Sequence, residues 1–159
     1  MSESIEILHA STEHLGEIVP LFDAYRCWYG EENNLDGARR FLSQRMMAAE
    51  SEIFFVRMND QPAAFAQLYP AFSSVAMESI WILNDLYVID SARGQGIGTL
   101  LLETAVEFAR ALGAVRLELA AGVNNRMAQS VCEAHGWVKD TEFLRYSLSV
   151  TDEINEPGA

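Results

Sequence analysis

The chain has little of what several large classes of protein require. It has 11 lysine and arginine residues against 23 aspartate and glutamate residues, and it therefore lacks the excess of basic side chains that neutralises nucleic-acid phosphates. It contains no run of about 18 apolar residues, the length needed to span a membrane. Its acidic N-terminus lacks the basic-then-apolar order of a secretory signal. We therefore expect neither nucleic acid nor a membrane as a partner.

Cysteine is also scarce. The two cysteines, Cys27 and Cys132, have neither metal-ligand spacing nor CxxC spacing. We therefore expect no disulfide, no metal site and a reducing, cytoplasmic setting. Half of the 159 residues are hydrophobic, enough to bury a sizeable core, so we expect a single domain over residues 1–159 with a loose tail over 151–159. The net charge of −12 either serves solubility or favours encounter with a cationic substrate.

Hydrophobic periodicity predicts an alternation of strands and helices. Asn59-Asp60-Gln61 is typical of a hairpin turn, and Pro70 is expected to stop the strand that follows this turn. The order of elements predicts a mixed α/β sheet of about seven strands with helices on its faces. The predicted helices cover about 12–29, 36–50, 97–112 and 125–135, and the predicted strands cover about 5–8, 53–56, 64–69, 79–88, 115–119, 137–138 and 143–150.

A glycine-rich segment, residues 93–98, lies between a predicted strand and an amphipathic helix. Glycines let the backbone approach an anion closely, and the free N–H groups at a helix start point toward that anion. The Rossmann pattern needs a third glycine where Thr99 stands, and the Gly-Lys-Ser/Thr of a P-loop is absent. The pattern that fits is Gln/Arg-x-x-Gly-x-Gly/Ala, met by Arg93, Gly96 and Gly98. The segment therefore predicts a pyrophosphate-binding site, to which the Arg93 side chain can add a charged hydrogen bond.

With these residues the chain resembles the GNAT superfamily of acyl-CoA-dependent N-acetyltransferases. The strand Asp85-Leu86-Tyr87-Val88, together with the glycine loop and its helix, looks like the CoA-binding core of that family. Asn125-x-x-Ala128 and Gly136-Trp137 look like its second conserved stretch, so the likeness covers residues 4–150. The surroundings of residues 68–70 and 81–85 look closest to the histone, polyamine and D-amino-acid acetyltransferase branch. The implied fold is a mixed, mostly antiparallel sheet with helices on both faces, whose splayed central strands hold CoA.

The resemblance implies particular roles. The backbone of the strand before the loop pairs with the pantetheine arm, and a backbone N–H near Leu86 or Tyr87 stabilises the oxyanion formed during transfer. Asn125 matches an asparagine near the pantetheine. The residues expected to bind acetyl-CoA are Leu86, Tyr87, Val88, Arg93, Gly94, Gln95, Gly96, Ile97, Gly98, Thr99 and Asn125.

The catalytic acid and base are less well defined by the resemblance. Many relatives carry a tyrosine where this chain has Cys132; the thiol either protonates the departing CoA sulfur or is a small buried hydrophobic residue. For the base, strand alternation places Ile82, Asn84 and Leu86 on one face, where Asn84 can orient a water that carries the proton outward. The same alternation turns Asp85 to the opposite face, where we expect a structural hydrogen-bond acceptor.

The expected reaction is direct attack of a primary amine on the thioester of acetyl-CoA. The acceptor is predicted to be a small cationic metabolite, such as a polyamine or an amino acid, because aromatic faces can hold an ammonium group. Acetylation of a protein lysine or N-terminus, and acyl-CoA binding without catalysis, are the alternatives. Dimers are common in this family, and residues 143–150 could serve as a strand at such an interface. The predicted acceptor-binding residues are Tyr25, Trp28, Tyr29 and Tyr69.

Overall fold

The structure is a computed structural model that describes residues 3–151. The chain divides into two compact units, residues 1–120 and 121–159. The first unit holds β1 (Ile5–His9), η1 (Thr12–His14), α1 (Leu15–Trp28), α2 (Leu35–Met47), β2 (Glu52–Met58), β3 (Gln61–Ser73), β4 (Glu78–Val88), η2 (Asp90–Ala92), α3 (Ile97–Ala111) and β5 (Leu117–Leu119). The second unit holds α4 (Arg126–Ala134).

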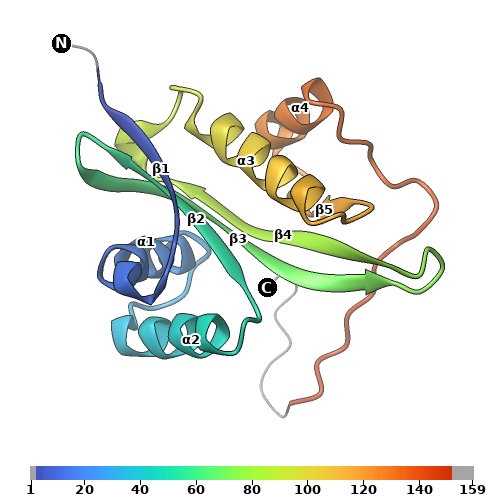
Figure 1. The fold of residues 1–159 in the computed structure, drawn as a ribbon, viewed down its shortest axis with the longest axis horizontal. Helices are drawn as coiled ribbons and strands as arrows, with labels where there is room; N and C mark the ends of the chain where they lie inside the picture. Colours follow the sequence, from blue (N-terminus) through green and yellow to red (C-terminus); the bar gives the residue numbers. More distant parts are fainter. Residues whose placement is uncertain (1–2, 152–159) are drawn as a thin grey trace. The chain divides into compact units, whose positions relative to one another are not determined.

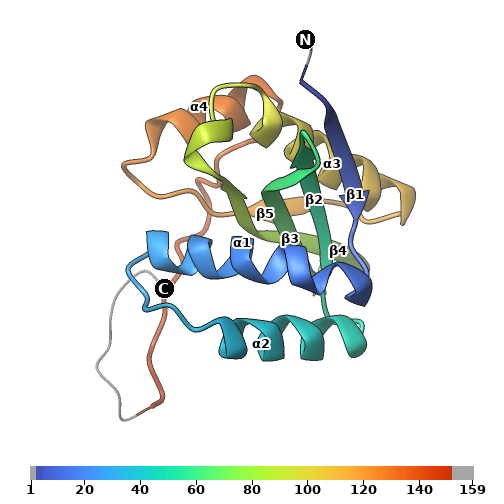
Figure 2. The same cartoon turned by 90° about the vertical axis from the view of Figure 1, so that its left-hand side faces the viewer.

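A five-stranded sheet in the order β1-β2-β3-β4-β5 forms the centre of the first unit. Every neighbouring pair is antiparallel except β4 and β5, which are parallel. Helices α1 and α2 lie side by side on one face of this sheet, and α3 lies on the other (Figure 1, Figure 2). The mixed α/β architecture predicted from the sequence is confirmed.

Each face of the sheet buries its own apolar layer. On the side of α1 and α2, the alternating residues of β2 and β3 pack against the apolar stripes of the two helices, with Phe55, Phe65, Ile18 and Leu42 fully buried. On the side of α3, Phe108 packs edge-on against Phe54 and Trp81, with ring centroids 5.3 and 5.1 Å apart. The two layers fix the sheet from both sides and hold the start of α3 beside the end of β4.

Two turn and strand predictions have different outcomes. The hairpin turn between β2 and β3 is confirmed: Asn59 and Asp60 both have positive φ, 52° and 63°, as a two-residue hairpin turn requires. The prediction that Pro70 ends its strand is wrong, because β3 continues to Ser73. Trp81, the partner of Pro70 in β4, donates its N–H to the carbonyl oxygen of Arg116 on the other side, so the two residues exchange no ladder bond. The backbone nitrogen of Pro70 therefore faces the side of β2, where pairing ends at Leu68, and its missing N–H leaves no ladder bond unmade.

The number of strands differs from the prediction. The structure has five strands within residues 3–151, where the sequence predicted about seven. The two that are missing are 137–138 and 143–150, which lie in the second unit and have no regular structure. The expectation of a single domain stays a prediction, and the tail predicted to be loose lies outside the described residues from position 152 onward.

Candidate active site

The glycine loop reverses the chain between η2 and α3. Gly94 and Gly96 have φ values of 77° and 80°, a left-handed conformation that side chains other than glycine adopt only with strain. A Cβ atom built on Gly94, Gly96 or Gly98 would meet no atom within 4 Å, so the space in front of the loop is open. Among the described residues, no hydrogen bond satisfies the backbone N–H groups of Gly96, Ile97, Gly98 and Thr99. The loop therefore presents several free donors and a helix N-terminus to an anion.

Arg93 holds this loop to the end of β4. Its Nε donates to the carbonyl oxygen of Val88 at 2.9 Å, and its Nη1 lies 2.6 Å from Oδ1 of Asp90. Its guanidinium group stacks over the rings of Trp28 and Tyr87, at 5.7 and 5.8 Å from their centroids. Arg93 is thus a structural link between the loop, β4 and the end of α1, and its predicted contact with a phosphate stays a prediction.

The edge of β4 beside this loop is open. The parallel strand β5 pairs with β4 only at Trp81, Ile82 and Leu83. Beyond Leu83, no strand among the described residues pairs with this edge, although the opposite edge of β4 is paired with β3 up to Val88. Backbone groups of the segment 84–88 are therefore available to an extended ligand that adds itself as a strand.

A β-bulge interrupts β4 where β5 diverges. Gln67 of β3 pairs with Asp85, but the next residue, Leu68, pairs with Leu83, so Asn84 is the extra residue of the bulge. The prediction that Ile82, Asn84 and Leu86 share one face is therefore wrong. The register turns Leu83 toward α3 and Asp85 toward α1. A single sequence gives no clear sign of a bulge, because the apolar run through β4 is compatible with either face.

Asp85 lies in a buried polar cluster on the α1 face of the sheet. Its side chain is only 5% exposed, and it accepts hydrogen bonds from Nε2 of Gln67 at 2.7 Å and from Nδ2 of Asn84 at 3.1 Å. Burial raises the pKa of the Asp85 carboxyl, and its hydrogen bonds, that from Gln67 first, partly oppose the rise. Asp85 is a hydrogen-bond acceptor, as predicted, but it lies at the bulge beside the open strand edge.

Gln67 is not among the site residues predicted from the sequence. The side chain is completely buried, and its Oε1 has no hydrogen-bond partner among the described residues. A glutamine in the middle of an otherwise apolar strand was the available signal, because buried polar side chains need a specific partner.

Three of the four predicted acceptor-binding residues gather at the end of α1. The ring centroid of Tyr29 lies 5.1 Å from that of Tyr25 and 5.0 Å from that of Trp28. Tyr25 also packs 6.0 Å from Tyr87 of β4. The fourth is Tyr69 of β3: burial, followed by the charge of Asp85, raises the pKa of Tyr69 to about 12. Of the four residues, Tyr25 and Tyr69 are the two whose electrostatic surroundings include Asp85.

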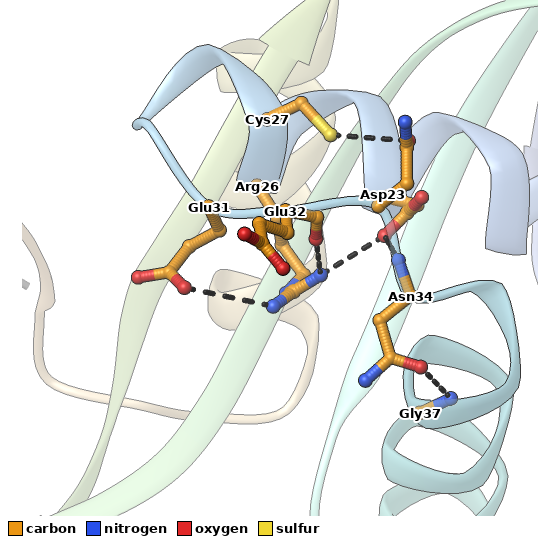
Figure 3. A network of polar contacts seen from close by, with 8 residues as sticks. Asp23, Arg26, Cys27, Glu31, Glu32, Asn34 and Gly37 are labelled. Atoms are coloured by element: carbon orange, nitrogen blue, oxygen red, sulfur yellow. Dashed lines mark hydrogen bonds and ion pairs between the residues drawn. The ribbon is translucent and has the colours of Figure 1, made fainter.

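A polar network fixes the loop that follows this aromatic turn (Figure 3). The buried carboxylate of Asp23 accepts from Nη1 of Arg26 at 2.9 Å and from the backbone N–H of Asn34 at 3.0 Å. Arg26 also donates to the carbonyl oxygen of Glu32 at 3.2 Å. Asn34 in turn caps α2 by accepting from the N–H of Gly37 at 2.9 Å. These bonds tie the end of α1 to the start of α2 and hold the aromatic turn in place.

Two predicted site residues belong to the second unit. Asn125 caps α4, its side-chain oxygen accepting from the N–H of Ala128 at 3.1 Å. Cys132 lies on the same helix, and burial, followed by the charge of Glu133, raises the pKa of its thiol. Their proposed roles at the loop of the first unit stay predictions.

Within residues 3–151, no set of three or more His, Cys, Asp or Glu side chains is placed to hold a metal ion. No helix in this range is both long enough and apolar enough to cross a membrane.

Free N–H groups at a glycine loop, an open strand edge and a buried carboxylate next to a bulge are together suited to an enzyme whose ligand is a diphosphate with an extended amide arm. Residues 18–137 match the family model described as Acetyltransferase (GNAT) family. The chain belongs to this family, and it is an acyl-CoA-dependent N-acetyltransferase.

Two relatives and one distant structure illustrate the family likeness. The chain is 42% identical over 146 residues to a Bacillus subtilis (strain 168) protein named uncharacterized N-acetyltransferase YhfO, with 92% of this chain and 98% of the relative covered. A crystal structure of a probable acetyltransferase is 40% identical, with a TM-score of 0.87 and 93% and 99% of the two chains covered. The aminoglycoside N-acetyltransferase AAC(6')-Iy, solved with CoA, shares the fold at 17% identity, with a TM-score of 0.77 and 93% and 97% covered.

Proposed function

We propose that this enzyme transfers the acetyl group of acetyl-CoA to a primary amine of a small cationic metabolite, a polyamine or an amino-acid-like molecule, by direct attack. The observation that carries the proposal is the buried Asp85 carboxylate, which has no cationic partner among the described residues and lies beneath the aromatic turn of α1. A buried carboxylate without a counter-ion is costly, and a cationic ligand would offset that cost. The net charge of −12 favours the encounter.

The free N–H donors and the open space in front of the glycine loop support binding of acetyl-CoA through its diphosphate. The N–H groups of residues 94–99 would form this diphosphate-binding site, with Arg93 beside it. The open edge of β4 supports pairing of the pantetheine arm with Leu86, Tyr87 and Val88. Asn125 is proposed to lie near the same arm. When bound, acetyl-CoA supplies a thioester carbonyl to the attacking amine, and a backbone N–H near Leu86 or Tyr87 stabilises the charge on its oxygen.

Three finer assignments are part of the proposal. The surroundings of residues 68–70 and 81–85 support the histone, polyamine and D-amino-acid acetyltransferase branch. The scarcity of cysteine supports a cytoplasmic setting. The segment 143–150, which has no regular structure in the second unit, supports a homodimer in which it pairs as a strand.

Two measurements test the proposed function. Calorimetry with CoA and acetyl-CoA should show association, since the loop needs no other partner. Release of the CoA thiol should then be measured with spermidine, putrescine, lysine and a lysine-containing peptide as acceptors. We expect turnover with at least one free amine and little with the peptide. Turnover with the peptide alone would indicate a protein acetyltransferase, and binding of CoA without turnover would contradict the proposal.

A further inference from the structure

The side chain of Arg93 lies against two aromatic rings from different parts of the chain. Its guanidinium carbon is 5.7 Å from the ring centroid of Trp28 and 5.8 Å from that of Tyr87. Tyr87 belongs to β4 and directly precedes Val88, whereas Trp28 is the last residue of α1. The cation–π contact with Trp28 therefore connects the end of α1 to the residue at which the glycine loop begins.

The polar contacts of Arg93 leave one end of its guanidinium group free. Nε donates to the carbonyl oxygen of Val88, and Nη1 pairs with Asp90. Nη2 has neither a hydrogen bond nor an ion pair with any described residue. The ion pair holds the group only weakly, because the Asp90 side chain is 90% exposed and solvent screens an exposed pair. The bond to Val88 and the two rings are therefore the contacts that can fix the direction of the free donors.

Trp28 contributes little to the buried core. It is 56% exposed, and it is not part of the apolar layer between the sheet and the helices α1 and α2. Its backbone is nevertheless fixed, because the N–H of Tyr29 donates to the carbonyl oxygen of Arg26 at 3.0 Å and closes the end of the helix. A large aromatic ring held in this way at the surface is suited to contact with a cation.

We propose that Trp28 is a positioning residue for acetyl-CoA: its ring holds the Arg93 guanidinium so that Nη2 is free to bond to the diphosphate at the glycine loop. This role differs from the predicted contact of Trp28 with the acceptor amine. The inference rests on the proposed function, because it needs the diphosphate of acetyl-CoA at the loop. It does not depend on which amine is acetylated.

The physical reason is the conformational freedom of arginine. An unrestrained arginine side chain loses rotamer freedom when it binds a phosphate, and this loss weakens binding. In this chain the rings and the bond to Val88 restrict Arg93 before any ligand arrives. The planar guanidinium then presents its remaining donors in a fixed direction, as recognition of phosphate oxygens requires. Loss of the Trp28 ring should therefore weaken CoA binding while the N–H groups of the loop stay free.

The first test removes the ring. Trp28→Leu should raise the dissociation constant for CoA, measured by calorimetry without any amine, about five- to tenfold. Trp28→Phe keeps a smaller aromatic face and should raise it about two- to threefold. Phe41→Leu is the matched control, because it removes the cation–π contact of Arg45 at 5.2 Å within α2, which involves no residue of β4 or the loop. This control should leave the affinity for CoA unchanged.

The second test asks whether Trp28 acts through Arg93. Arg93→Gln keeps a side chain that the loop pattern allows but removes the charge, so the ring has no cation to hold. In this background, Trp28→Leu should change the dissociation constant for CoA by less than about 1.5-fold, because the two substitutions remove the same interaction. If Trp28 instead touched CoA directly, or only stabilised the end of α1, the effects of the two substitutions would add.

These outcomes separate the two proposals. If the wild type shows no association with CoA, the proposed function fails and the role of Trp28 fails with it. If the wild type binds CoA but Trp28→Leu, folded as judged by thermal melting, binds it as tightly, only the role of Trp28 is overturned. Additive effects of the Trp28 and Arg93 substitutions would also overturn it. Should Trp28→Leu fail to fold, Trp28→Phe takes its place, and its smaller loss of affinity should likewise disappear in the Arg93→Gln background.

Discussion

Gly96 has a φ of 80° at the residue that precedes α3, so any side chain placed there is strained. Gly96→Glu would also bring a negative charge to the proposed diphosphate-binding site, where its repulsion of the diphosphate would cost several kcal/mol. We expect the variant to stay folded and its dissociation constant for CoA to rise by more than about 100-fold, measured by calorimetry.

The control for this prediction lies just past the other end of the same helix. Gly113 has a φ of 75°, and a Cβ atom built there meets no atom within 4 Å, so Gly113→Glu carries the same charge and similar backbone strain. Both variants should lose about 1–2 kcal/mol of stability. Only Gly96→Glu should lose CoA. Equal CoA affinity in the two variants would contradict the assignment of the loop.

Cys132 offers a second test at the scale of a single residue. Its thiol is predicted to stand where many relatives carry the acid, but burial raises the pKa of the thiol and so makes it a weaker proton donor. A CoA thiolate of comparable basicity can leave without help. We therefore expect Cys132→Ala to lower turnover by less than about threefold between pH 6 and 9. A loss of about 100-fold would instead identify Cys132 as an essential acid.

At the scale of the element, the first turns of α1 and α2 each contain a glycine. A Cβ atom on Gly16 would meet no atom within 4 Å, whereas one on Gly37 would lie 2.6 Å from Nδ2 of Asn34. Alanine favours a helix over glycine by about 1 kcal/mol, so Gly16→Ala should stabilise the protein. Gly37→Ala should gain nothing, because Asn34 must give up its cap, which is also worth about 1 kcal/mol.

Chemical denaturation of the two variants measures this difference. Gly16→Ala should exceed Gly37→Ala in free energy of unfolding by about 1 kcal/mol. In an Asn34→Ala background, where no cap remains to be lost, Gly37→Ala should become stabilising. If Gly37→Ala still gave no gain there, the clash with Asn34 would not be its cause.

The elements also show what the sequence could and could not predict. Apolar periodicity and turn residues were sufficient for the helices and for the β2–β3 hairpin, because these are determined by local preferences. The bulge at Asn84 was not predictable, since it depends on how β3 and β4 pair. The prediction that Ile82, Asn84 and Leu86 share one face followed from strict alternation, which the bulge interrupts. The glycine loop was predictable because its chemistry is confined to six adjacent residues.

Dependence on a pairing partner also explains why the predicted strands in the second unit are missing. Residues 143–150 have the apolar and polar alternation of a strand, with Tyr146, Leu148 and Val150 in sequence. A strand exists only when another strand pairs with it, and residues 146–150 form no backbone–backbone hydrogen bond with any other described residue. The pattern therefore indicates a strand-forming segment, while no described strand of this one chain pairs with residues 146–150.

At the scale of the whole molecule, the exposed apolar residues of this segment lead to a prediction about assembly. Leu148 and Val150 are 83% and 91% exposed, and apolar side chains of this kind gain free energy when a second copy covers them. We expect a dimer in light scattering at micromolar concentration. Leu148→Lys should shift it toward the monomer, because a charge would be buried at the strand interface.

Val123 provides the control for that substitution, because it is equally apolar and 90% exposed but lies outside the segment 143–150. Val123→Lys makes the same change of charge and should leave the dimer intact. The two variants separate a specific strand contact from a general effect of added charge on a protein whose net charge is −12. A wild type that stays monomeric at 100 µM, a concentration about a hundred times that needed to half-populate a dimer of micromolar affinity, would contradict the predicted dimer.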